Sequence, residues 1–174
     1  MINDLFINIL LLTSITFVIG HISKDISMEI INSLYGKVIV GVGGGLMGIL
    51  LMTYTIQVEG TSTLLDLRVF AIMLVSYIGG IMPTIIAGIM IGIYRGVYYG
   101  INMSSIVAVF QILLYIIFFH IIDKLIIAEW KKWFFKTLIS LIILLTFFCY
   151  LLRNLENIQT VLFRFSFKIG RAHV

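Results

Sequence analysis

The sequence predicts an all-α fold, a polytopic membrane bundle of about six transmembrane helices with a short glycine-rich helical hairpin. Three observations predict it. Of the 174 residues, 61% are hydrophobic and 11% are charged, whereas soluble domains are roughly half apolar and about 25% charged. The apolar residues form long unbroken runs, while strands of a membrane barrel would alternate apolar and polar residues. A single proline, eight methionines and thirteen phenylalanines suit helices in lipid.

The charged residues and the single cysteine argue against a nucleic-acid-binding protein, a disulfide-bonded domain and a cleaved signal peptide. The net charge of +4 comes from basic residues scattered along the chain, which is typical of contacts with lipid headgroups rather than of a nucleic-acid surface. Cys149 is the only cysteine, so no intrachain disulfide can form. The first apolar run follows Asp4 and no basic residue, which favours an uncleaved first helix over a signal peptide.

A window of about 19 residues, the length that crosses a bilayer, locates six apolar spans. They are residues 5–20, 38–58, 67–80, 83–99, 104–122 and 134–152. The segment between the first two spans is polar and is expected to be a connector. The segment before the last span mixes lysines with Trp130 and Trp133, a composition typical of headgroup depth.

The third and fourth spans raise a choice between one rod and a hairpin. Residues 69–94 carry no charge and would form a single tilted helix about 39 Å long. Two short helices are favoured, because Gly79 and Gly80 supply backbone freedom and Pro83 suits a helix start. A turn at the glycines brings Asp66 and Arg95 to the same depth. Each arm would then be roughly 21 Å long, against about 30 Å of hydrocarbon.

The charges that frame this hairpin are the candidate ligand site. An unpaired charge in hydrocarbon costs at least about 2.5 to 3.5 kcal/mol, so partners are expected. Asp66 is predicted to pair with Arg95, which leaves Arg68 to face a headgroup, Glu59 or a ligand. Asn102 is expected nearby. The alternative is that Asp66 caps the third helix while both arginines reach lipid phosphates. An arginine fork suits a carboxylate or phosphate, so a small anionic ligand is the expected partner.

Small residues recur on two of the predicted helices. Every fourth position of the fourth helix is small: Gly80, Thr84, Gly88, Gly92, Gly96 and Gly100. The second span carries Gly41, Gly44, Gly45 and Gly48. Such stripes allow close approach of helices, so these two helices are predicted to pack on each other or across a dimer.

Motifs for catalysis are missing from the sequence, which contains no P-loop, HExxH, CxxC or Gly-x-Ser-x-Gly. No catalytic residue, metal or cofactor is therefore predicted. His120 and Asp123 share a helical face, but two ligands rarely hold a metal. Basic residues divide five against six between the two sides of a six-span layout, so their distribution does not predict the orientation.

The stretch LDLRVFAIMLVSYIGGIMPTIIAGIMIGIYRGVYYGIN resembles the signature of the LytS-type five-transmembrane receptor region. The matching positions are Asp66, Arg68, Gly79, Gly80, Gly88, Gly92, Tyr94, Arg95 and Gly100. Pro83 departs from the pattern, in which proline directly follows the glycine pair. The resemblance implies a bacterial inner-membrane sensor with both termini in the cytoplasm. Its output would be either a histidine kinase of a phosphorelay linked to the cell wall or a GGDEF diguanylate cyclase, and the parent protein would be a homodimer.

The chain itself contains no kinase or GGDEF motif. Residues 1–152 are interpreted as the sensor region and residues 153–168 as the start of a cytoplasmic signalling helix. The last six residues, IGRAHV, resemble the translation of a sequencing adapter, so the gene is expected to be cut before its output domain. Two alternatives stay open: the membrane substrate-binding subunit of a vitamin-type transporter, and a structural membrane protein without ligand.

Overall fold

The computed structural model describes residues 2–23, 28–54, 56–57, 64–65 and 67–153. It confirms the all-α fold. The helices are α1 (Ile2–Ser23), α2 (Met28–Asn32), α3 (Leu34–Thr53), α4 (Arg68–Gly79), α5 (Ile81–Tyr99), α6 (Met103–Leu125) and α7 (Glu129–Arg153). Two short strands, β1 (Ile56–Gln57) and β2 (Leu64–Leu65), pair antiparallel between α3 and α4. Asp66, Glu59 and the expected signalling segment after residue 153 lie outside the described residues.

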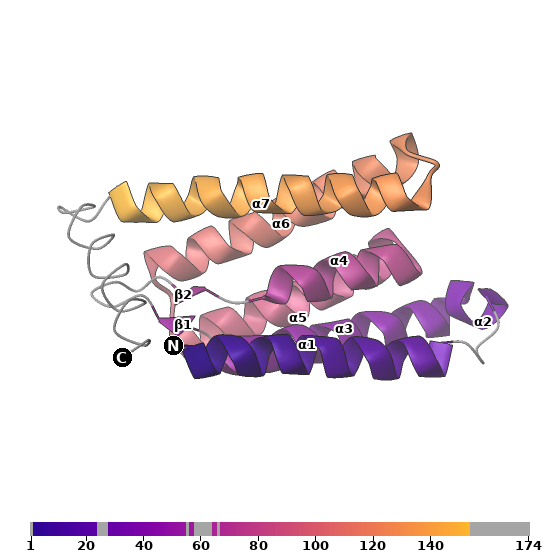
Figure 1. Cartoon of the computed structure of the whole chain (residues 1–174), viewed down its shortest axis with the longest axis horizontal. Coiled ribbons are helices and arrows are strands. Elements are labelled where there is room, and N and C mark those ends of the chain that lie inside the picture. Colours follow the sequence, from indigo (N-terminus) through magenta and orange to yellow (C-terminus); the bar gives the residue numbers. More distant parts are fainter. Residues whose placement is uncertain (1, 24–27, 55, 58–63, 66, 154–174) are drawn as a thin grey trace.

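The long helices run side by side, and α2 lies across one end of the bundle (Figure 1). The α4–α5 and α6–α7 turns mark one end, here called the Gly80 end, on the right of Figure 1. The α5–α6 turn marks the other, the Gly100 end. The start of α1 and the end of α7 both lie at the Gly100 end (Figure 1).

Three of the described helices are long and apolar enough to cross a membrane, namely Leu34–Thr53, Ile81–Tyr99 and Met103–Leu125. Ile9–His21 and Arg68–Gly79 are shorter apolar helices. Large apolar side chains stand on the outside of the bundle, among them Phe17 at 76% exposure and Val97 at 80%. Such a surface requires lipid around it, which makes this a multi-pass membrane protein.

The hairpin predicted at the glycine pair is confirmed. Gly80 has φ +73°, a conformation that glycine adopts without the strain of a Cβ. Its amide donates to the Ser76 carbonyl at 3.1 Å, and its carbonyl accepts from Thr84 Oγ1 at 2.7 Å. A Cβ at Gly79 would lie 2.5 Å from Pro83 Cγ, so the ring of Pro83 occupies the space that Gly79 leaves open. A continuous rod through residues 69–94 is therefore ruled out.

The glycines of α3 receive side chains from two neighbouring helices. A Cβ at Gly45 would lie 2.7 Å from Met90 Sδ of α5, and one at Gly41 would lie 2.9 Å from the Pro83 carbonyl oxygen. Gly44 faces Val75 of α4 in the same way. Because these positions lack a Cβ, α4 and α5 both approach the α3 backbone closely.

The glycine stripe of α5 faces a different helix. A Cβ at Gly88 would lie 2.9 Å from Ile112 Cγ2 and Ile116 Cδ1, both on α6, and one at Gly92 would lie 3.8 Å from Val109 Cγ2. No atom lies within 4 Å of a Cβ built at Gly96 or Gly100. The small-residue stripes were expected to face each other, and this expectation is wrong: the α5 stripe faces α6. Helix α3 packs on α5 through its own glycines and the side chains of α5.

Candidate functional site

Arg95, one of the predicted site residues, is buried near the Gly100 end of α5 with 1% of its surface exposed. Its Nη2 donates to Ser104 Oγ of α6 at 2.8 Å. Its guanidinium carbon lies 4.8 Å from the centre of the Tyr99 ring, within the range of a cation–π interaction. Arg95 thus ties the end of α5 to the start of α6 from inside the bundle.

Arg68, the second predicted arginine, is the first residue of α4 and is also buried. Its Nη1 lies 3.8 Å from Met52 Sδ of α3. The Tyr99 hydroxyl donates to the carbonyl of the same Met52 at 2.7 Å, and Tyr99 carries Arg95 over its ring. The fold therefore brings both arginines into contact with one hydrogen-bonded pair: Arg68 contacts Met52, and Arg95 lies over the ring of Tyr99.

Asn102, the third predicted residue, is the N-cap of α6. Its side-chain oxygen accepts from the Ser105 amide at 2.8 Å, and its side-chain amide donates to the Tyr99 carbonyl at 3.2 Å. The Ser105 hydroxyl donates to the carbonyl of Gly100 at 2.8 Å. Asn102 therefore closes the turn next to the arginines. Asp66, predicted to pair with Arg95, lies outside the described residues.

We refer to Arg68, Arg95 and Ser104 as the arginine centre. Two guanidinium groups offer planar forks of N–H donors, which match the two oxygens of a carboxylate or phosphate. The hydroxyl of Ser104 adds a further polar group within 2.8 Å of Arg95. The arrangement is suited to binding a small anion at the Gly100 end of the bundle.

A second polar centre, missed by sequence reasoning, lies toward the Gly80 end. Lys136 of α7 is 1% exposed, and its Nζ lies 2.8 Å from Asp123 Oδ1 and 2.9 Å from Oδ2. Lys136 also donates to Ser76 Oγ of α4 at 3.0 Å, and Ser76 donates to Asp123 Oδ2 at 3.1 Å. We call these three residues the lysine clasp. It joins α4, α6 and α7 at one point.

The available signal was a lysine inside the last apolar span. Lys136 lies two positions after the start of the predicted span 134–152, where an ionisable side chain requires a partner. Asp123 was instead considered with His120 as a metal pair. In the structure, Asp123 forms an ion pair with Lys136 and accepts a hydrogen bond from Ser76. Among the described residues, no group of three potential metal ligands is found.

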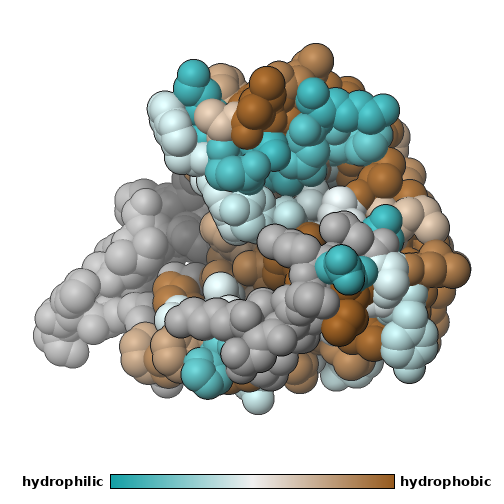
Figure 2. All heavy atoms as spheres, turned by 90° about the vertical axis from the view of Figure 1, so that its right-hand side faces the viewer, coloured by the Kyte–Doolittle hydropathy of each residue, from teal (hydrophilic) through white to brown (hydrophobic). Residues whose placement is uncertain are grey.

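A cavity of about 710 Å³ adjoins the lysine clasp, within the range of roughly 300 to 1,000 Å³ that ligand pockets occupy. Ser76 and Asp123 are part of its wall, together with the aromatic rings of Tyr77 and Trp133, whose centres are 4.9 Å apart. Helices α1, α2, α4, α6 and α7 all contribute to the lining. Figure 2 looks onto this end of the molecule, where hydrophilic side chains gather over the α6–α7 turn.

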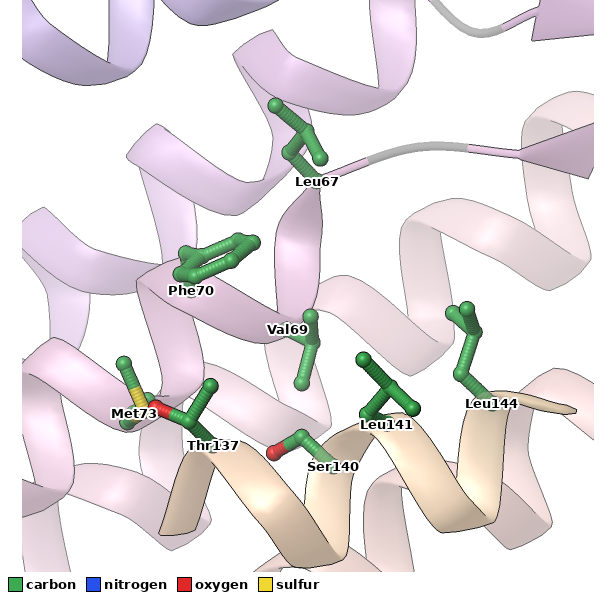
Figure 3. A pocket seen from close by; sticks show the side chains of 8 residues that line it. All are labelled: Leu67, Val69, Phe70, Met73, Thr137, Ser140, Leu141 and Leu144. Atoms are coloured by element: carbon green, nitrogen blue, oxygen red, sulfur yellow. Dashed lines mark hydrogen bonds between the residues drawn. The ribbon is translucent and has the colours of Figure 1, made fainter. Parts of the chain in front are cut away.

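A smaller apolar groove of about 210 Å³ lies between α4 and α7, nearer the Gly100 end than the lysine clasp. Figure 3 shows Phe70 and Val69 of α4 on one side and Leu141 and Leu144 of α7 on the other. Its lining is almost entirely apolar, which suits an acyl chain or another apolar side chain better than a polar ligand.

The bundle of apolar helices defines a multi-pass helical membrane protein with two buried polar centres. The family model described as 5TMR of 5TMR-LYT matches residues 20–164, and the chain therefore belongs to the LytS-type five-transmembrane receptor family. The matched residues include α2 to α7 and leave most of α1 outside. It identifies the chain as a membrane sensing region. No curated protein and no solved structure matches the chain.

Proposed function

We propose that this chain is the sensing region of a bacterial signal-transduction protein and that it detects a small carboxylate or phosphate at the arginine centre. The observation that carries the proposal is the convergence of two buried arginines, Arg68 and Arg95, on one Met52–Tyr99 pair. Burial of two cations in a membrane protein is costly and marks functional positions. The planar donor forks of the two arginines match the oxygens of a carboxylate or phosphate.

The site's location explains how binding would reach an output domain. The arginine centre joins α3, α4, α5 and α6 at the Gly100 end, and α7 ends at the same end of the bundle (Figure 1). A ligand that binds one arrangement of these helices more tightly shifts the population toward that arrangement. The size of the shift is limited by the difference between the ligand's affinities for the two arrangements. The segment after α7 would carry the shift to the output.

The finer identity rests on the family. We assign the output of the parent protein to either a histidine kinase of a phosphorelay tied to the cell envelope or a GGDEF diguanylate cyclase, with a homodimeric parent in the bacterial inner membrane. Both ends of the described bundle's chain, at the start of α1 and the end of α7, lie on one side (Figure 1), which is consistent with two cytoplasmic termini. Reading the genomic frame past codon 168 tests this assignment. Kinase or GGDEF motifs would support it, and a stop codon beside an ATPase gene would favour a transporter subunit.

The ligand proposal is tested on the whole chain in lipid nanodiscs. Unfolding temperature is measured with a panel of small carboxylates and inorganic phosphate, since a ligand that binds only the native state stabilises it by RT ln(1 + [L]/Kd). We expect stabilisation that is lost in Arg95→Gln and in Arg68→Gln. Lys124→Gln is the matched control, because Lys124 is an exposed cation at the Gly80 end. Equal stabilisation of Arg95→Gln and the unmodified chain would refute the role of Arg95.

A further inference from the structure

Helix α7 meets α4 through polar and aromatic side chains at the Gly80 end. The side-chain contacts between them gather in the first turns of α7, where the Trp133 ring meets Tyr77 and Lys136 bonds Ser76. Farther along, the apolar groove intervenes between Phe70 and Leu141 (Figure 3). The lysine clasp is therefore a polar tie between α4, α6 and α7, the last described helix.

The cavity beside the clasp has a wall that favours a positive charge. Its charged lining residues are two carboxylates, Asp123 and Glu129, and one ammonium, Lys132. Lys132 is already paired with Glu129 at 2.8 Å. The rings of Trp133 and Tyr77 belong to the same wall, and aromatic faces attract organic cations through their quadrupoles. The ammonium of Lys136 lies behind Asp123 and is not part of the lining.

We propose that this cavity is a second binding site, that it accepts an organic ammonium group, and that its occupancy loosens the lysine clasp. A ligand ammonium near Asp123 would share the carboxylate with Lys136, and each Lys136–oxygen contact would weaken as a result. Because Ser76 and Lys136 are partners in the same network, weakening it releases α7 from α4. The proposal is independent of the arginine centre, which lies at the opposite end of the bundle.

The ammonium group could belong to a soluble amine or to the headgroup of an ethanolamine lipid. Trp130 and Lys131 stand exposed beside the cavity, a composition typical of headgroup depth. The two sources share one chemistry, and the lipid composition of the nanodisc separates them.

Trp133 supplies the binding signal. The chain has two tryptophans, so Trp130→Phe leaves Trp133, in the cavity wall, as the only tryptophan. Benzylamine is the probe, with benzyl alcohol and benzoate as the neutral and anionic analogues. In nanodiscs of phosphatidylglycerol, we expect a saturable change in Trp133 emission with benzylamine alone. No saturable change, or equal binding of benzoate, would overturn the proposal.

Variants locate the probe. Glu129 is exposed, so Glu129→Gln is expected to leave the fold intact and to weaken benzylamine binding at least fivefold. Glu29→Gln is the matched control, because Glu29 is an exposed acid on α2 that is not among the lining residues. Unchanged affinity in Glu129→Gln would contradict the site. Addition of ethanolamine lipid assigns the natural source: weaker probe binding indicates the lipid headgroup, and unchanged binding indicates a soluble amine.

The coupling to α7 has its own readout. The variant carries Cys149→Ser, which removes the only native cysteine, together with Phe70→Cys and Leu141→Cys. Phe70 and Leu141 lie on opposite sides of the apolar groove (Figure 3). The rate of disulfide formation between the two introduced cysteines reports how close α7 stays to α4. We expect benzylamine to slow the reaction at least twofold in the chain with Glu129 and to have no effect in Glu129→Gln. An unchanged rate at saturating benzylamine would refute the coupling.

Discussion

The guanidinium of Arg95 donates to the hydroxyl of Ser104 at 2.8 Å, and both residues are buried. This bond links α5 to α6 across the turn that Gly100 forms with φ +76°. A buried hydrogen bond to a charged group is worth roughly 1.5 to 3 kcal/mol, and its loss leaves the charge without that partner. The pair therefore fixes both the turn and the direction of the arginine.

Ser104→Ala tests the orienting role of that bond. We expect the affinity of the stabilising anion to fall at least fivefold, because the Arg95 fork is no longer held toward the site. Ser105→Ala is the matched control, since it removes a bond to the Gly100 carbonyl without touching Arg95. Thermal unfolding with and without ligand distinguishes the two variants. Equal loss of ligand affinity in both would show that the turn, not the bond, matters.

Lys136→Met tests the lysine clasp. Removing one partner of a buried ion pair costs about 3 to 5 kcal/mol, whereas replacing both partners with neutral groups is often nearly neutral. We expect Lys136→Met to lower the unfolding midpoint strongly, and the double variant Lys136→Met with Asp123→Asn to recover most of the loss. Denaturation followed by circular dichroism in detergent measures both. A double variant less stable than the single one would contradict a paired role.

Gly80→Ala tests the hairpin turn. A Cβ at Gly80 would meet no atom within 4 Å, so the loss of stability comes from the backbone conformation, φ +73° and ψ −153°, at about 1 to 3 kcal/mol. Gly96→Ala is the control, because Gly96 also has open space around its Cβ position but lies inside α5 at a helical conformation. There alanine should be neutral or stabilising. Comparable destabilisation by both substitutions would rule out the strained turn as the cause.

Gly44→Ala tests the packing of α3 on α4. The added methyl would collide with Val75, and overpacking of this kind costs about 1 to 3 kcal/mol. We expect Val75→Ala to rescue Gly44→Ala in the double variant, which a double-mutant cycle measures. Gly43→Ala serves as the control, since no atom lies within 4 Å of its Cβ position. Additive losses in the cycle would show that the two residues do not meet.

The sequence by itself determined the six apolar helices, their place in a membrane and the reversal at the glycine pair. These features follow from local properties. Hydropathy sets which segments can lie in lipid, and Gly80 with Pro83 lowers the free energy of a turn relative to that of a continued helix. The family signature around Asp66, Arg68 and Arg95 belongs to the same local information. Each span was predicted to within a few residues of the helix observed, except that α3 starts and ends earlier than predicted and α7 starts earlier.

Only the tertiary structure decided which elements meet. The periodicity of a helix places Gly88 and Gly92 on one face but does not say that α6 rather than α3 covers it. In the same way, Asp123 and Lys136 belong to different helices, and nothing local to either one shows that Ser76 of α4 completes their network. Packing of six helices around shared side chains selects these neighbours, because each helix face must be filled without voids and each buried charge must find its partner.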